Sequence, residues 1–361
     1  MLLAPRGATD GRSQAVAYPC RYDCTVRARP QKVEPKVKCY CCSGEASRFG
    51  TFQNKNRVVQ RFRCTKCGKT FSEDQPLGRL RVSHDKVVQI VKLLSEGIGI
   101  RAVSRLAQCH QHTVLEVLRV VGERCEYLHD RLVRNVTIDS LQVDELWTRV
   151  GIRQARTTPE DTERGDQYTF LGIAADTKLI VSYYTGKRNA ESTFAFAADA
   201  ASRIAGQVQI TCDSFHPYPS VLNSFFNRRL DLAVMQKIFK KDTYNGSDPN
   251  RRYSPAPYAS VFVKRIIGAP DETKICTSHI ERTNLTVRHF NKRFARLGLG
   301  WSRKLDNHRR AVSLFVAVFN FCKVHRTLGT TPAHASGITD GAWTIERLIE
   351  EATRREPSLE Q

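Results

Sequence analysis

Three acidic residues stand in segments that could bring them together. Asp144 lies inside the apolar, strand-like segment LQVDELW, and Asp213 ends the strand-like segment VQITCD. Glu281 lies 68 residues beyond Asp213 and is the only acid in the basic helical segment SHIERTNLTVRHFNKR. Open α/β sheets place their sites at the carboxyl ends of strands, and Mg²⁺ prefers a few carboxylates plus waters. The pattern therefore predicts a site for Mg²⁺ or Mn²⁺ that catalyses phosphoryl transfer.

Glu145 directly follows Asp144 in the same segment. Successive residues of a strand face opposite sides, so we expect only one of the two to point into a given cleft. We assign Asp144 to the cleft and expect Glu145 to face away. Each acid taken alone has an ordinary alternative, because acids also serve as turn residues at strand ends and as wet-face residues of alternating strands.

Two pairs of cysteines predict a second metal site. Cys39 and Cys42 form one C-x-x-C pair, Cys64 and Cys67 form another, and 21 residues separate the pairs. Four thiolates at this spacing are typical of a zinc ribbon, whose bound Zn²⁺ replaces the core that so short a segment lacks. Cys41 is an alternative ligand in the first pair. Twelve cysteines without a secretion signal indicate a reducing compartment, where clustered thiols favour metal over disulfides.

A helical region follows the cysteines. Residues 83–125 contain three helical patterns, with a glycine-marked break after the first and a four-residue break before the third. This layout predicts a helix-turn-helix domain over residues 80–130, although helix triplets also occur as plain packing modules. The third helix would enter the DNA major groove. We expect three residues at its leading end to contact base edges: Gln111, His112 and Thr113. Arg101 and Arg105 of the second helix would contact phosphates.

The region from 135 to 330 alternates strands and helices. A strand trio, an alanine-rich helix, another strand and a terminal helix indicate an α/β domain, for which a ribonuclease H-like sheet is one candidate topology. Residues 1–35 lack periodicity and predict a disordered tail. Residues 331–361 are expected to form a C-terminal tail or helix.

The charge indicates the partner. The chain has 57 Lys and Arg against 36 Asp and Glu, a net charge of +21. A net positive charge of this size favours binding to a polyanionic partner, which is usually nucleic acid. No run of ~18 apolar residues occurs, which argues against a membrane span and favours a cytoplasmic, nucleoid-associated location.

Four segments resemble the transposases of the bacterial insertion-sequence-one family: VDELWTRVG, CDSFHPYP, SHIERTNLTVRHFNKRFARLGLGWSRKLDNHRRAV and HRTLGTTPA. The resemblance covers about residues 37–330. It implies a multidomain chain with a zinc ribbon (36–75), an all-α helix-turn-helix and an α/β ribonuclease H-like catalytic domain. It also implies that Asp144, Asp213 and Glu281 form an Asp-Asp-Glu triad that binds magnesium.

The resemblance also gives roles to the basic helix around Glu281. Asn284 and Arg288 fall on the same helical face as Glu281, where they would steady its carboxylate or meet the scissile phosphate. Arg282 and Arg293 belong to an adjacent stripe suited to the DNA backbone. A solvated basic face is the alternative, although residues 281–310 hold nine Arg or Lys and only two acids.

Together these features predict a DNA transposase that binds terminal inverted repeats, cleaves a strand at the element's end and transfers it to target DNA. Pairing two ends requires at least a homodimer on double-stranded DNA. Two alternatives stay open: a transposon-derived DNA-binding regulator without catalysis, and a simple metal-dependent DNA nuclease.

Overall fold

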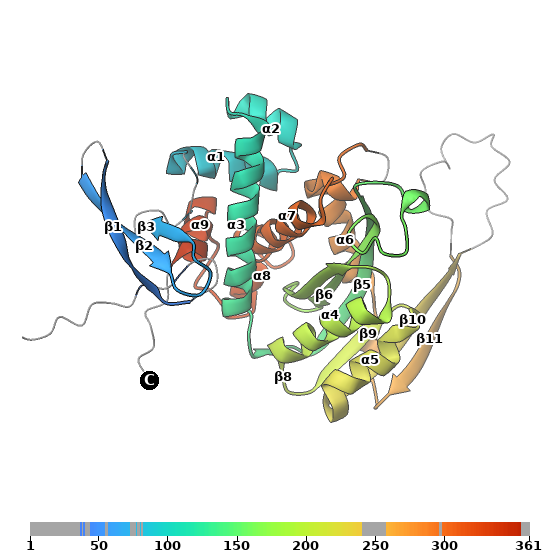
Figure 1. Ribbon diagram of the computed structural model, residues 1–361. Helices are drawn as coiled ribbons and strands as arrows, with labels where there is room; N and C mark the ends of the chain where they lie inside the picture. The colour runs from blue at the N-terminus through green and yellow to red at the C-terminus, as the bar shows by residue number, and fades with distance from the viewer. Residues whose placement is uncertain are drawn as a thin grey trace, which may run out of the picture.

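The computed structural model describes residues 37, 39, 44–54, 57–72, 77, 80, 82–239, 258–295 and 298–354. The expected N-terminal tail and Cys42 lie outside these residues. A small sheet lies on one side of the long helix α3, and a larger sheet with its covering helices lies on the other (Figure 1). Among the described helices, none is both long and apolar enough to cross a lipid bilayer.

The small sheet is antiparallel and has its own core. Its strands pair in the order β1, β2, β3, and a bulge interrupts the first pair between Arg48 and Thr51. Phe62 and Phe71 stack at 5.9 Å beside the buried cysteines Cys39 and Cys64. The strands are β1 (Ala46–Asn54), β2 (Arg57–Cys64) and β3 (Thr70–Ser72).

Three helices follow, as the periodicity predicted. They are α1 (His84–Ser95), α2 (Ile100–Leu106) and α3 (Gln111–Leu132). Ser83 caps α1 by accepting a hydrogen bond from the Lys86 amide. Gly97 follows the C-terminal end of α1 at φ +72°, and a Cβ there would lie 2.9 Å from the His289 carbonyl oxygen. The chain therefore needs glycine where α1 meets a segment almost 200 residues away.

A six-stranded mixed sheet forms the centre of the larger part, in the order β11, β10, β9, β5, β6, β7. The strands β5, β6 and β7 form an antiparallel meander, β9 is parallel to β5, β10 is parallel to β9, and β11 is antiparallel to β10. The strands are β5 (Ser140–Val150), β6 (Gly165–Ala174), β7 (Ile180–Gly186), β9 (Val208–Cys212), β10 (Leu230–Phe239) and β11 (Tyr258–Ile267). A separate parallel pair joins β4 (Val136–Thr137) to β8 (Ile204–Ala205).

Helices cover both faces of this sheet. Leu141 and Val143 of β5 share one buried cluster with α4 and α5, whereas Leu146 belongs to a second cluster with α6 and α7. The covering helices are α4 (Ala190–Arg203), α5 (Pro217–Phe226), α6 (Ser278–Phe290) and α7 (Leu305–Ala317). Odd and even residues of β5 thus face different helix layers, as alternation requires.

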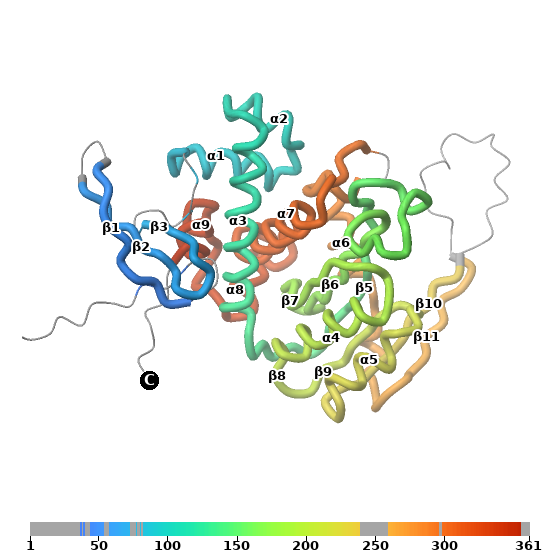
Figure 2. Tube along the Cα trace, viewed as in Figure 1, coloured from blue at the N-terminus to red at the C-terminus, as the bar shows by residue number. Residues whose placement is uncertain are grey.

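The helix triplet and the large sheet share one buried cluster that runs from α1 to β10. The trace in Figure 2 shows α7 beside α3, and their contact is close. A Cβ on Gly122 of α3 would lie 2.4 Å from the Arg310 carbonyl oxygen of α7. At its C-terminal end, α7 continues into a π-helical turn (Val318–Cys322), which α8 (Pro332–Ala335) follows. Trp343 then stacks on Phe321 just before α9 (Ile345–Thr353).

Candidate functional site

The sheet has an open edge beside β5. β9 pairs with β5 only over Ser140–Gln142 and then ends at Cys212. β5 itself continues to Val150, paired on its other side with β6. Within the described residues, the part of β5 beyond Gln142 therefore has no strand partner on the β9 side, and Asp213 is the first residue after β9.

Three carboxylates meet at this edge. One oxygen from each of Asp144, Glu145 and Asp213 lies within 4.8 Å of the other two. The Asp144 Oδ1 accepts the Glu145 amide at 2.8 Å, and the Asp213 Oδ1 accepts the Phe215 amide at 3.0 Å. The two aspartates are therefore fixed by local backbone, and their remaining oxygens are left for other partners.

The expectation that Glu145 faces away from the site was wrong. Glu145 and Asp144 do leave opposite faces of β5, but the missing β9 pairing lets both carboxylates turn toward Asp213 at the open edge. The Glu145 side chain is only 4% exposed, and its Oε1 has no hydrogen-bond partner among the described residues.

Glu281 lies next to this group without belonging to it. The start of α6 docks on β5, because Gln142 Oε1 accepts the His279 and Ile280 amides, both at 3.0 Å. The Glu281 Oε1 accepts hydrogen bonds from Thr277 Oγ1 at 2.8 Å and from Lys237 Nζ of β10. Metal ligation by Glu281 stays a prediction.

Asn284 and Arg288 of α6 act on Asp144. The Asn284 Nδ2 donates to the Asp144 Oδ2 at 2.6 Å, and the Arg288 charge favours the ionised form of Asp144. Asn284 is buried, and its Oδ1 has no partner within the described part of the chain. Sequence reasoning placed both residues on the right helix face but paired them with Glu281.

Burial makes two acids of the cluster, Asp144 and Glu145, reluctant to ionise. It raises the pKa of Asp144 to about 6, and the charges of Asp213 and Glu281 add to the rise. It raises the pKa of Glu145 to about 7, with a further contribution from Asp213. Buried carboxylates with raised pKa values and few hydrogen bonds gain most from a bound cation.

Arg188 is a functional candidate that sequence reasoning missed. Its Nη2 lies 3.4 Å from Glu145 Oε2 and 3.6 Å from Asp213 Oδ2. The guanidinium carbon also sits 4.1 Å from the centre of the Phe215 ring. A single arginine between β7 and α4 has no sequence signal, because its role depends on where that connection passes over the end of β9.

The cluster fits a divalent cation. Mg²⁺ uses one or two carboxylates plus waters and substrate phosphate, and three converging carboxylates satisfy that demand. The buried Glu145 Oε1 is an additional acceptor, and the neighbouring Tyr218 hydroxyl favours the ionised form of this carboxyl. Metal bound here would bring phosphate to the open edge of the sheet.

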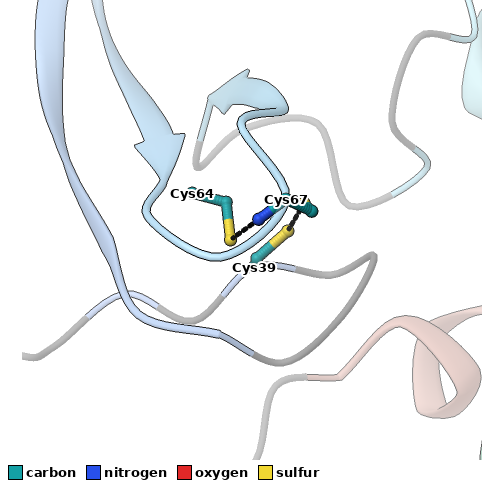
Figure 3. A group of neighbouring side chains, drawn as sticks. All are labelled: Cys39, Cys64 and Cys67. Carbon is teal, nitrogen blue, oxygen red and sulfur yellow. Dashed lines mark hydrogen bonds between the residues drawn. The ribbon is translucent and has the colours of Figure 1, made fainter.

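Three of the four predicted zinc ligands come together in the small sheet (Figure 3). One sulfur from each of Cys39, Cys64 and Cys67 lies within 4.8 Å of the others. The Cys39 and Cys67 sulfurs are 3.7 Å apart, close to the ~3.8 Å edge of a tetrahedron with Zn–S bonds of ~2.3 Å. The Cys64 sulfur accepts the Lys66 and Cys67 amides at 3.3 and 3.4 Å.

The predicted DNA-binding residues fall into separate places. Arg101, Arg105, Gln111, His112 and Arg293 line one hollow between the helix triplet and the segment that precedes α7. Thr113 is half-buried in the first turn of α3, where its amide donates to the His110 carbonyl at 2.9 Å. Arg282 is exposed on α6.

Comparison with known proteins gives little. No family model matches the chain, and no curated protein matches it. One similar solved structure is the cryo-EM structure of a piggyBac transposase synaptic complex with hairpin DNA. The likeness has a TM-score of 0.34 at 7% identity and covers 75% of this chain and 69% of that one. A likeness of this size carries no weight for fold or function.

Proposed function

We propose that the chain is a metal-dependent DNA transposase. The observation that carries the proposal is the convergence of Asp144, Glu145 and Asp213 at the open edge of β5. A half-buried carboxylate cluster that suits Mg²⁺ and opens beside cationic side chains is the arrangement that phosphodiester chemistry needs. The net charge of +21 supports a nucleic-acid substrate.

The proposal includes the domain architecture expected from the sequence. A ribonuclease H-like assignment for residues 135–330 is supported by the order of a strand trio, α4, β9 and α5. A zinc ribbon is supported by the sulfur geometry of Cys39, Cys64 and Cys67. A helix-turn-helix is supported by the succession of α1, α2 and α3 with a short break before α3. Double-stranded DNA and a second copy of the chain are the proposed partners.

Asp144 and Asp213 hold the metal in this proposal, and Asn284 fixes the orientation of Asp144. A metal held here would offset the negative charge on a phosphate oxygen and lower the pKa of the attacking hydroxyl. Glu145 contributes the third carboxylate of the cluster. Glu281 is the further acid on the α6 side, and its Oε1 accepts a hydrogen bond from Lys237.

Arg188 then balances the charge of the site. Without metal, its guanidinium neutralises Glu145 and Asp213. When a cation takes over that task, Arg188 is left to hold the substrate phosphate, to which a guanidinium donates in bidentate fashion. Phe215 keeps the side chain at the edge of the site.

The test is incubation of the purified chain with a supercoiled plasmid carrying the DNA that flanks its gene, with Mg²⁺ or EDTA. A transposase gives joined strand-transfer products with Mg²⁺ and none with EDTA. Nicking of any plasmid without joined products would replace the proposal with a nuclease. Specific binding without cleavage at any metal concentration would replace it with a regulator.

A further inference from the structure

A second place in the molecule has the character of an anion site. A hollow of about 900 Å³ separates α2 and the start of α3 from the segment between α6 and α7. Among the described residues that line it, six are Arg or Lys and none is Asp or Glu. We call it the basic hollow and define it by these six residues: Arg101, Arg105, Lys292, Arg293, Arg303 and Lys304.

The basic hollow is not neutralised from within the chain. None of its six cations forms an ion pair with a carboxylate in the described residues. Arg293 is half-buried, its Nε donates to Ser302 Oγ at 2.9 Å, and burial lowers its pKa to about 10. An enclosed charge without a counter-charge is costly, so such a site gains from a bound anion.

The side of the basic hollow formed by residues 292–304 is attached by hydrogen bonds to β5, the strand that carries Asp144. Thr148 Oγ1 donates to the Arg293 carbonyl at 2.7 Å, and the Gly151 amide donates to the Ser302 carbonyl at 2.9 Å. Arg149 stacks on Trp301, with its guanidinium carbon 3.8 Å from the ring centre. The cations of this wall therefore keep a fixed position relative to the carboxylate cluster.

Two routes give the separation between the cluster and the basic hollow. Along β5, Arg149, which stacks on the hollow residue Trp301, lies five residues beyond Asp144, which corresponds to about 17 Å. Along α6, Phe290, which lines the hollow, lies nine residues beyond Glu281, the acid next to the cluster, which corresponds to about 14 Å. At ~3.4 Å per base pair, both distances equal about four to five base pairs of duplex DNA.

We propose that the basic hollow binds the backbone of duplex DNA about four to five base pairs from the phosphate at the carboxylate cluster. The binding itself needs only the unpaired cations, whereas the spacing rests on the proposed function. Arg101 and Arg105 of α2 contact the DNA backbone from one side. Arg303 and Lys304, on the side attached to β5, contact it from the other. The helix triplet and the carboxylate cluster would thus contact the same DNA segment through the hollow.

The first experiment measures binding of the full chain to a 30-base-pair duplex by fluorescence anisotropy in EDTA, so that cleavage plays no part. The hollow variant Arg105→Glu/Lys304→Glu should bind at least about tenfold more weakly, with a salt slope about two units smaller. The control Arg228→Glu/Arg326→Glu makes the same charge change at exposed cations that do not line the hollow. It should lose less than about threefold.

Equal losses in the two variants, at unchanged melting temperature, would overturn the site and leave only net charge. A single strand that binds the hollow more tightly than the duplex would overturn the choice of duplex. A wild-type chain that binds DNA through the hollow yet never cleaves with Mg²⁺ would refute the proposed function and leave the hollow intact.

The second experiment tests the spacing. A neutral methylphosphonate linkage is moved one position at a time away from the cleavage site. Wild-type affinity should fall most when the linkage is four to five base pairs away, and the hollow variant should be insensitive there. A sensitivity that peaks elsewhere, or that survives in the hollow variant, would overturn the spacing.

Discussion

The Asn284 amide of α6 donates to the Asp144 Oδ2 of β5 at 2.6 Å, although the two residues are 140 positions apart. Asn284 is buried, and Asp144 accepts the Glu145 amide with its other oxygen. Asp144 is thus held on both oxygens before any metal arrives, which fixes where a cation can sit.

Removing this donor should weaken the site. Asn284→Ala should reduce Mn²⁺ affinity by about tenfold or more, as expected when a partner that orients a metal ligand is lost. Leu285→Ala, at an exposed position next along α6, is the matched control and should bind Mn²⁺ normally. Titration calorimetry at pH 7.5 measures both, and equal affinities would deny Asn284 its positioning role.

Replacing the acids one at a time should identify the ligands. Asp144→Asn and Asp213→Asn should each lower DNA cleavage by on the order of 10²-fold or more, because a few kcal/mol of transition-state stabilisation are lost. Their double variant should be little worse, since the ligands act as a unit. DNA binding in EDTA should be unaffected or slightly tighter.

Glu145→Gln and Glu281→Gln separate the two candidates for the third ligand. The cluster geometry predicts that Glu145→Gln weakens Mn²⁺ binding by about tenfold in the absence of DNA, while Glu281→Gln acts only on cleavage. The opposite result, with normal metal binding in Glu145→Gln and loss in Glu281→Gln, would make Asp144, Asp213 and Glu281 the ligand set.

Metal binding should depend on pH in a defined direction. The pKa values of Asp144 and Glu145 are raised to about 6 and about 7, so both carboxyls are more readily protonated in the folded chain. Their contribution to metal-free stability is present below about pH 4 and is lost as pH rises toward 7. Cations need the ionised forms, so Mn²⁺ affinity should rise on the order of tenfold between pH 6 and pH 8. A flat profile would contradict the buried cluster.

Arg188 should compete with metal. Arg188→Met removes the cation beside Glu145 and Asp213, so Mn²⁺ should bind about three- to tenfold more tightly. Cleavage should nevertheless fall, because the guanidinium that would hold phosphate is gone. Arg188→Lys keeps the charge and should restore metal affinity toward wild type. Weaker metal binding in Arg188→Met would show that the arginine only supports the fold of the edge.

Zinc should hold the small sheet. Cys64→Ser should release zinc, measured by elemental analysis, and loosen the packing of Phe62 on Phe71. Cys109→Ser changes a cysteine outside the sulfur cluster and should retain the metal. A wild-type chain that is folded in this region without zinc would defeat the assignment.

Elements with a clear local residue pattern were predicted better than pairing between strands that are distant in sequence. The alternation around Asp144 and the helical periodicity of residues 83–125 both correspond to observed elements, because burial of one face imposes a period on the residues. The strand trio and the one further strand expected from the sequence leave out β10 and β11, which lie between residues 230 and 267. A long connection joins the two strands in place of a two-residue turn, so no short hairpin pattern marks their pairing.

The candidate site was likewise predicted only as far as local sequence patterns reach. Alternation along β5 is local and was read correctly, but the fate of Glu145 depends on where a different strand stops. That information is not in the residues around Glu145. Likewise, Arg101 and Arg293 were each identified as cations for DNA, whereas the hollow that joins them exists only through packing between distant segments.

The unbroken course of α3 has a mechanical consequence. At 22 residues the helix is about 33 Å long, its first turn lines the basic hollow, and Gly122 seats it against α7. A helix packed against neighbouring helices along its length does not bend easily, so α3 is not expected to act as a hinge. Any mismatch between the path from hollow to cluster and a straight duplex must then be taken up by the DNA, at an elastic cost that depends on its base sequence. Flexible pyrimidine–purine steps between the two contact points would ease that bend, so the chain would favour certain sequences at base pairs that it never touches.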